Sequence, residues 1–491
     1  MKENRCAYPR GKGVGGTSLL NALIYARGAS IDFDNWCAKG NSGWCYKDVL
    51  PYFKMSEDFH NNAPDAVADM QYHGKGGPLY VSYPEPRSEQ CKVFFQASEE
   101  LGYNKTDCNG AHLLGVSPYQ LNVKNGKRQD SGTAFLKPVL DRQNLKVLTE
   151  SFVTRIIINE AKEAQGLIFT HKGKAYKVAA SKEVIVSAGS ISSPQILMLS
   201  GIGPRKHLQE IGVPIIQNLE VGSQLYDHLQ MYGITFSSNL SEPVPSLREQ
   251  VENYLHGVGR LSTALTQQGV GYYQTPVEKT PNYPDLEIGF YHSNDTSYAL
   301  HTVQKWKEDV ARVIAAVDSS SSFTMYLTLL HTKSSGTVRL QSSSPFVYPL
   351  IDSNCLSDPE GKDIETAYQA ILFAKKLIKT KAFRRIDAKL EIKPIKQCLG
   401  KYKYMSRKYW YCAIRYITGH DNHPVASCRM GPDPSLGDVV DAQLRVHGVK
   451  KLRVADASVI PVSTSAHINA ICYMIGEKLA DLLKIEYKVN A

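Results

Sequence analysis

Two widely separated segments of this 491-residue chain share one scheme, in which a short apolar strand is followed by a turn and an apolar helix. In the first, residues 183–187 (EVIVS) lead through Gly189 into a helix that stops near Gly201. In the second, residues 452–456 (LRVAD) lead through a turn into a helix predicted over 467–485. Strands that alternate with helices build parallel sheets. The two segments therefore predict an α/β nucleotide-type domain whose parts lie far apart in the sequence.

The rest of the chain has a different pattern. Short strands separated by Ser, Pro and Gly turns fill residues 230–350. Other predicted elements are helices over 17–27, 47–55, 89–102 and 362–382, and a strand over 145–158. This mixture predicts an α/β plus α+β fold class, and the length is sufficient for two packed cores.

Composition excludes several classes of protein. Hydrophobic residues make up 43% of the chain and aromatic residues 9%, which excludes global disorder, and no apolar run reaches membrane-spanning length. The 57 basic and 47 acidic residues give a net charge of +10, a modest excess that does not require a nucleic-acid partner. Ten cysteines without a CxxC pair or a zinc-like spacing predict no metal site, although a few disulfides are compatible with them.

A glycine cluster near the start, Gly11-Lys12-Gly13-Val14-Gly15-Gly16, matches the G-x-G-x-x-G pattern letter for letter. The dinucleotide fingerprint needs a strand before it, and only the polar MKENRCAYPR precedes this cluster, so we reject that interpretation. A mobile glycine turn is the simplest alternative. The hydroxyls and the asparagine that follow on the predicted 17–27 helix favour a surface where backbone meets a flat ligand.

Several separated blocks resemble the motifs of glucose–methanol–choline (GMC) oxidoreductases. GKGVGGTSLLNALIYARGASIDFD, from residue 11, is similar to the first family motif, and GSISSPQILMLSGIG, from residue 189, is similar to the second. HPVASCRMGP, LRVADASVIP and AHINA resemble the closing region of the family. The blocks occur in the family's order over nearly the whole chain, and they are most similar to insect members of the glucose dehydrogenase type.

The resemblance implies a domain organisation. It places a discontinuous FAD-binding α/β domain in residues 1–35, 141–228 and 419–491, and an antiparallel-sheet substrate domain in residues 36–140 and 229–418. In the family, a βαβ unit that grips the ADP half of FAD precedes the first motif. This chain starts close to that motif, so we expect its FAD domain to be incomplete at the N-terminus.

The resemblance also implies a chemistry. GMC enzymes oxidise an alcohol by passing a hydride from carbon to flavin N5, and a histidine accepts the hydroxyl proton. His423 of HPVASC and His467 of AHINA match the catalytic pair. His467 stands at the start of the 467–485 helix, whose positive end would favour negative charge on the reduced flavin and lower the pKa of a nearby histidine. Oxygen or a quinone would take the electrons.

The cofactor contacts implied by the resemblance come from four parts of the chain. Leu20 stands where some relatives carry a histidine bound covalently to the flavin, so we expect noncovalent FAD. The matching contact positions are Gly15, Gly16, Thr17, Asn21, Ala22, Ile24, Val153, Asp456, Ala457 and Asn469.

Two rival functions remain open at this point. Some relatives cleave cyanohydrins on the same fold without net redox chemistry, and a shortened homologue could lack FAD and catalysis. The alcohol itself is not specified, because the substrate pocket is built from variable loops. Relatives are often secreted, which suggests an extracellular location, although the N-terminus has no apolar signal-like segment.

Overall fold

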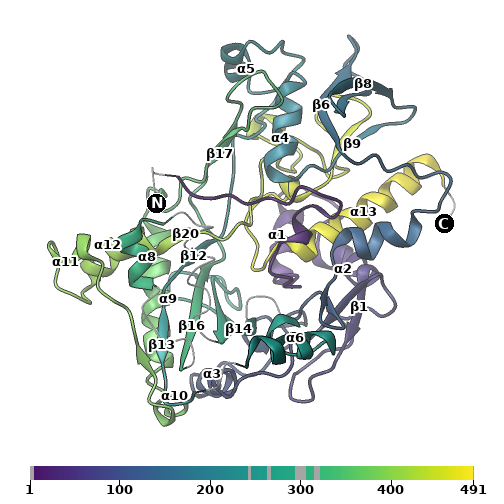
Figure 1. Ribbon diagram of the computed structural model, residues 1–491. Coiled ribbons are helices and arrows are strands. Elements are labelled where there is room, and N and C mark those ends of the chain that lie inside the picture. The colour runs from purple at the N-terminus through teal and green to yellow at the C-terminus, as the bar shows by residue number, and fades with distance from the viewer. Residues whose placement is uncertain (1–4, 242–244, 263–266, 293–305, 315–320, 490–491) are drawn as a thin grey trace.

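The computed structural model describes residues 5–241, 245–262, 267–292, 306–314 and 321–489, and its elements gather around two main hydrophobic cores (Figure 1). One core packs strands β9 and β21 with helices α2, α4 and α13. The other packs a large antiparallel sheet with helices α3, α9, α10 and α12. Two cores of different construction confirm the predicted α/β plus α+β class, whereas the domain boundaries stay a prediction.

The antiparallel sheet has eight strands in the described residues, with the order β19-β13-β16-β15-β14-β3 and with β12 and β20 joined beside β16. Its long central strands are β14 (Gln267–Tyr273), β15 (Leu286–His292) and β16 (Ser322–Leu329). All eight residues of β16 are buried, because α9 (Lys362–Leu377) packs against this strand. The shorter strands are β3 (Gly115–Pro118), β12 (Leu229–Met231), β13 (Thr235–Ser237), β19 (Lys389–Leu390) and β20 (Thr418–His420).

The parallel part is small. β9 (Val184–Val186) pairs with β21 (Leu452–Val454), although 265 residues lie between Val186 and Leu452. β9 is followed by α4 (Gly189–Leu199), and β21 by the turn at Asp456 and then by α13 (Asn469–Tyr487). The two strand–turn–helix segments predicted from sequence are therefore neighbours in space. Beside them, β6 (Ser151–Ile158), β7 (Ala164–His171) and β8 (Lys174–Ala179) form a three-stranded antiparallel sheet.

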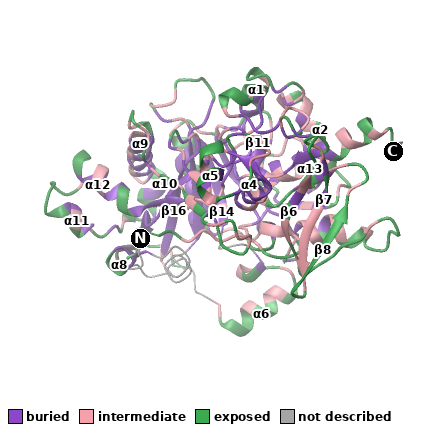
Figure 2. Cartoon of the chain, turned by 90° about the horizontal axis from the view of Figure 1, so that it is seen from above, coloured by how far each residue is buried: buried purple, intermediate pink, exposed green. Residues whose placement is uncertain are grey.

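Helices cover the edges of both cores. α2 (Tyr46–Ser56) packs against α13, and α3 (Glu89–Glu100) packs against α10 (Lys381–Arg385). Burial is concentrated around β14, β16 and α4, whereas α6 and β8 are exposed (Figure 2). The remaining elements are α1 (Ser30–Ala38), α5 (Arg205–Ile211), α6 (Leu247–Leu255), α8 (Glu308–Ile314), α11 (Lys396–Leu399), α12 (Arg407–Ile417), β1 (Glu57–His60), β2 (Leu79–Ser82), β4 (Val123–Lys124), β5 (Lys127–Arg128), β10 (Ile202–Gly203), β11 (Gln217–Asn218), β17 (Thr337–Arg339) and β18 (Leu350–Asp352).

The prediction of a helix over 17–27 was wrong. A short 3-10 helix spans Gly16–Leu19, and the chain then runs extended. Leu23 has a positive φ of 64°, and its N–H donates to the side chain of Asn21, which is an alternative to helical hydrogen bonding. Tyr25 N–H donates instead to the carbonyl of Gln120. Apolar periodicity was therefore overridden by pairing with a distant segment.

Two further predictions need correction at their ends. The strand predicted over 145–158 begins only at Ser151, and the helix predicted over 362–382 ends at Leu377. Thr380 accepts a hydrogen bond from Phe383 N–H and starts the separate helix α10. Two disulfides, Cys37–Cys45 and Cys398–Cys412, brace short segments of the chain. No helix among the described residues has the length and apolarity to cross a membrane.

Candidate active site

The two histidines predicted to act together meet in the structure. His423 Nε2 lies 3.1 Å from His467 Nδ1, and their rings are nearly perpendicular with centroids 4.6 Å apart. They come from positions 44 residues apart. His423 follows β20, whereas His467 stands two residues before α13. Their nitrogens face each other, an arrangement in which both could contact one small polar group.

Sequence reasoning missed two further members of this cluster. His228 Nδ1 lies 3.0 Å from His423 Nδ1, and Glu287 Oε1 lies 2.8 Å from His467 Nε2. Glu287 is 2% exposed, and its position in the apolar strand LEIGFYH was the signal that could have identified it. His228 stands in VGSQLYDH beside Asp227 and has no comparable signal.

The antiparallel sheet explains how these side chains converge. Leu229, directly after His228, pairs with His420 on β20, which brings His228 to the segment that carries His423. Gln230 on β12 and Glu287 on β15 both pair with Thr328 of the intervening strand β16. Glu287 therefore sits two strands away from β12, in register with it. On the other side, Asp32 accepts a 2.9 Å hydrogen bond from Ser465 N–H and fixes the approach to His467.

The surroundings of the three histidines shift their pKa values in different directions. Burial and the neighbouring His467 and His228 hold the pKa of His423 well below its ordinary value of 6.5. Burial and His467 lower the pKa of His228 to about 4. Burial also acts to lower the pKa of His467, but contact with Glu287 outweighs it and raises that pKa. The lowered pKa of His423 and the raised pKa of His467 both follow from burial and from the side chains that touch them.

Backbone contacts fix the position of His423. Its N–H donates to Asp227 Oδ1 at 2.8 Å, and Asp227 also accepts from the Tyr8 hydroxyl. Burial, partly offset by Tyr8, raises the pKa of Asp227 to about 6. Arg10 Nη2 donates to the carbonyl of Asn422 at 3.0 Å. The segment before the glycine cluster thus packs directly against the histidines.

The glycine cluster forms a tight loop whose backbone requires glycine. Gly15 and Gly16 have φ values of +114° and +54°. Gly11 N–H donates to Thr17 Oγ1 at 3.2 Å, which closes the loop on itself. Residues 5–12 form neither strand nor helix, which agrees with rejecting the dinucleotide fingerprint for this cluster.

The other predicted contacts of the first motif lie on the extended segment that follows. Arg128 donates to Asn21 Oδ1 at 2.9 Å, and Ile24 forms a bridge with Leu121. Ala22 packs against a small cluster that also contains Ile24 and Ala466. This cluster connects the extended segment to the residue directly before His467.

The C-terminal predicted contacts lie at the ends of β21 and α13. Asp456 Oδ2 accepts from Gly189 N–H at 2.9 Å and from Ser193 Oγ at 2.5 Å. Its carboxylate therefore holds the start of α4, and the neighbouring Ala457 is buried in the first core. Asn469 Nδ2 donates to Asn122 Oδ1 at 3.1 Å. Val153 lies on β6, a strand that packs against α4.

Two features of the structure, open glycine backbone and an unpaired hydroxyl, bear on whether these residues could hold the expected FAD. A Cβ added at Gly16 or Gly189 would meet nothing within 4 Å, so both peptides face open space. The buried hydroxyl of Tyr473, one helical turn after Asn469 on α13, has no hydrogen-bond partner among the described residues. Open glycine backbone and an unpaired hydroxyl suit a ligand rich in oxygen and nitrogen atoms. The residues present therefore fit a flavin dinucleotide.

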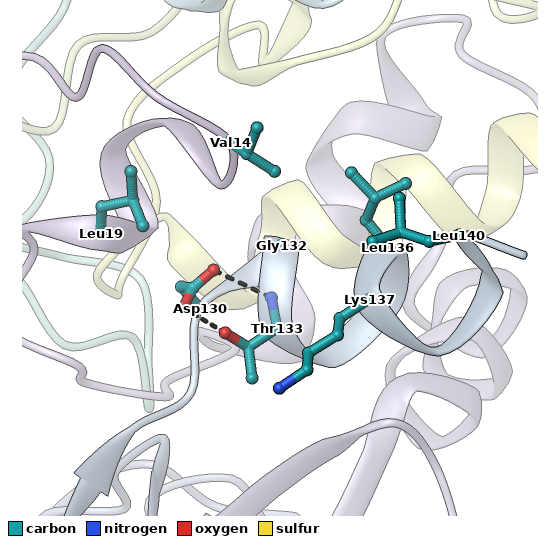
Figure 3. Close-up of a pocket in the computed structure, with 8 residues that line it drawn as sticks. All are labelled: Val14, Leu19, Asp130, Gly132, Thr133, Leu136, Lys137 and Leu140. Atoms are coloured by element: carbon teal, nitrogen blue, oxygen red, sulfur yellow. Dashed lines mark hydrogen bonds between the residues drawn. The ribbon is translucent and has the colours of Figure 1, made fainter. Parts of the chain in front are cut away.

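A cavity of about 280 Å³ opens beside the glycine loop (Figure 3). Asp130 and Thr133 are joined there by the hydrogen bonds drawn in Figure 3, and Val14 and Leu19 close the opposite side. None of the predicted site residues lines this cavity. It is therefore separate from the histidine cluster.

Comparisons with known proteins point to one family. Two family models described as GMC oxidoreductase match residues 1–230 and 332–476. Glucose dehydrogenase [FAD, quinone] of Drosophila pseudoobscura pseudoobscura is 36% identical over 98% of this chain and 75% of its own length. Alcohol dehydrogenase [acceptor] of Pseudomonas putida is 33% identical over 98% of this chain and 83% of its own. The structure of a formate oxidase variant from Aspergillus oryzae is 27% identical, with a TM-score of 0.83 over 98% of this chain and 85% of that one.

Proposed function

Because this chain belongs to the GMC oxidoreductase family, we propose that it oxidises an alcohol with bound FAD and that His423 takes the hydroxyl proton. The observation that carries this proposal is the 3.1 Å approach of His423 Nε2 to His467 Nδ1 in a buried cluster. Two such nitrogens can hold one hydroxyl oxygen between them and move its proton. Glucose, alcohol and choline dehydrogenases among the relatives support an alcohol as the substrate class.

FAD, when bound, would accept the hydride that leaves the alcohol carbon. The open peptides of Gly16 and Gly189 would approach its polar parts, and Gly15 is a further proposed contact. Thr17, Asn21, Ala22, Ile24, Val153, Asp456, Ala457 and Asn469 are the further proposed contacts. Leu20 has no nucleophilic atom, which supports noncovalent attachment. We also keep the two-domain division, with FAD between the discontinuous α/β parts.

His423 suits the role of proton acceptor because its low pKa keeps the ring neutral at physiological pH. Its backbone and Nδ1 are both held, by Asp227 and His228 respectively, so the ring cannot turn away from His467. His467 carries the opposite pKa shift and would donate a hydrogen bond to the alcohol oxygen. The pair thus combines an acceptor and a donor, as removal of a hydroxyl proton requires.

The electrons would pass from the reduced cofactor to oxygen or to a quinone. The name of the Drosophila relative includes quinone, which supports a quinone for this chain as well. The substrate would be a small-molecule alcohol.

A flavin spectrum followed by anaerobic reduction tests the proposal. We expect the purified protein to carry a yellow chromophore that acid precipitation releases into solution, because the attachment is noncovalent. A panel of sugars, aryl alcohols and sterol-like alcohols under nitrogen should include at least one compound that bleaches the flavin. A colourless protein that does not take up added FAD would contradict the proposal. So would a flavin-containing protein that cleaves a cyanohydrin and whose flavin no alcohol bleaches.

A further inference from the structure

The histidine cluster is a continuous chain of hydrogen bonds with an acceptor at each end. His228 Nε2 lies 2.7 Å from the carbonyl oxygen of Thr464, and His228 Nδ1 lies 3.0 Å from His423 Nδ1. His423 Nε2 then lies 3.1 Å from His467 Nδ1, and His467 Nε2 lies 2.8 Å from Glu287 Oε1. Three rings therefore share four hydrogen bonds.

The number of protons on the three rings follows from the two groups at the ends of this hydrogen-bonded series. A carbonyl oxygen only accepts, so His228 must donate to Thr464. Glu287 Oε1 also accepts a 3.2 Å hydrogen bond from the Tyr119 hydroxyl, as an ionised carboxylate does. Four hydrogen bonds then need four protons from three rings, and three neutral imidazoles carry only three.

We propose, building on the proposed histidine mechanism, that the chain His228–His423–His467 holds one proton more than three neutral rings and that Glu287 keeps this proton on His467. His423 then presents an unprotonated Nε2, and His467 presents an N–H. His228 and Glu287 are positioning residues, because each acts through the ring next to it.

The hydrogen bonds alone allow the extra proton on any of the three rings, and the charges around them select one. His467 touches the carboxylate of Glu287, whereas His423 lies between two other rings and feels the nearby charges of Arg10 and His420. The same contacts raise the pKa of His467 and lower those of His423 and His228. His467 lowers the pKa of Glu287 in turn, against the effect of burial.

Two other ionisable groups, Asp421 and Tyr119, face the three histidines. Asp421 Oδ2 lies 3.4 Å from His423 Nδ1 but makes no hydrogen bond within the described part of the chain. Burial raises the pKa of Asp421 well above its ordinary value, which favours the neutral form of this acid. Burial and Glu287 likewise raise the pKa of Tyr119, which remains a neutral donor. Glu287, which contacts His467 directly, raises the pKa of His467 more than Asp421 does.

This arrangement assigns a direction to the chemistry. An alcohol oxygen between the two rings accepts a hydrogen bond from His467 Nδ1–H and donates its own proton to His423 Nε2. FAD, when bound, would accept the hydride and both of its electrons from the carbon, so that a carbon–oxygen double bond would form as His423 takes the hydroxyl proton. The positive charge on His467 stabilises the negative charge that develops on oxygen.

The first test needs no turnover. In holoenzyme labelled with ¹⁵N-histidine, we expect the imidazole shifts at neutral pH to show one ring with both nitrogens protonated, assigned to His467 by its loss in His467→Asn. Glu287→Gln should abolish that imidazolium signal, and Glu287→Asp should retain it. Three neutral rings in the parent protein, or an unchanged signal in Glu287→Gln, would overturn the proposal.

The second test is the pH dependence of flavin reduction by an alcohol under nitrogen. The parent rate should fall as the pH rises through the raised pKa of His467, because the imidazolium is then lost. Glu287→Gln should shift that fall to lower pH and slow reduction by about 10²-fold at neutral pH, the size of a lost transition-state hydrogen-bond donor.

Asp285→Asn is the matched control. Asp285 is a buried acid directly before β15, and it accepts from Thr275 rather than from a histidine. The pH profile of Asp285→Asn should equal that of the parent. If both variants shift the profile equally, the effect is structural and the proposal fails. If the imidazolium is seen but no alcohol bleaches the flavin, the proton assignment stands and the proposed function fails.

Discussion

Two buried networks in this protein join histidines to carboxylates, and they differ in how many carboxylates each ring has. In the first, His73 lies between Glu57, at 3.1 Å from Nδ1, and Asp107, at 2.8 Å from Nε2. Arg27 adds a 2.7 Å ion pair to Glu57. In the histidine chain of the active site, a single glutamate contacts one of the three linked rings, that of His467. The first network gives His73 a carboxylate at each ring nitrogen, whereas both hydrogen bonds of the His423 ring go to other histidines.

This difference separates structural from chemical use of the same residues. His73 donates from both nitrogens and has no lone pair for a substrate. Burial acts against its charge, but Asp107 and Glu57 outweigh it and raise the pKa of His73. His423 has only rings as hydrogen-bond partners of its side chain within the described residues, and its pKa is lowered. A neutral buried histidine with an unprotonated nitrogen is suited to accept a proton.

The largest effect is expected from breaking the network around His73. Arg27→Met leaves the buried carboxylate of Glu57 without its guanidinium partner, since both side chains are fully buried. Removing one member of such a pair typically costs about 3–5 kcal/mol. Urea unfolding should therefore show a loss of that size in the free energy of unfolding. The remaining folded protein should reduce its flavin at close to the parent rate, and a loss below about 1 kcal/mol would show that the network does not stabilise the fold.

The reverse result is expected in the active site. His423→Ala removes the proposed proton acceptor and should slow flavin reduction by at least about 10²-fold, whereas its free energy of unfolding should change much less than that of Arg27→Met. Stopped-flow reduction under nitrogen measures the rate. His73→Ala is the control, because it should lose stability and keep the rate. Parent-like reduction in His423→Ala would remove His423 from the mechanism.

The contrast also shows what the sequence could predict. Short motifs predicted that His423 and His467 act together, and the structure brings the two rings into contact, whereas their catalytic roles stay a prediction. The strand–turn–helix patterns around β9 and β21 likewise predicted two elements that pair in space. Local patterns of this kind can be recognised without knowing which distant residues they contact.

Contacts that depend on the register of the sheet could not be predicted from the sequence. Glu287 reaches His467 only because β15, β16 and β12 align Glu287, Thr328 and Gln230. The predicted 17–27 helix failed for a similar reason, because residues 120–122 pair with this segment and replace its helical hydrogen bonds. The raised pKa of His467 follows from the same long-range contact, whereas sequence reasoning had considered only the nearby helix end.

A smaller effect should appear in the pH dependence of stability. A histidine whose folded pKa is raised contributes stability that is complete below its unfolded pKa of about 6.5 and is lost as the pH rises through the folded value. His73 should therefore make the parent less stable as the pH increases above about 6.5, by at most about 1.4 kcal/mol per pH unit. Comparing urea unfolding of the parent and His73→Gln across this range isolates the contribution. A constant difference between the two proteins at all pH values would show that His73 is not charged.

The smallest effect is expected at Asp421, the second acid near the histidine chain. It lies 3.4 Å from His423 Nδ1, and burial raises its pKa well above the ordinary value. An amide has the shape of the protonated acid, so Asp421→Asn changes little in size or charge. Flavin reduction should slow by far less than the roughly 10²-fold of a lost acid–base group, and the pH profile should keep its position. A profile shifted as in Glu287→Gln would mean that Asp421 is ionised and that two carboxylates, as around His73, share the charge of the active site.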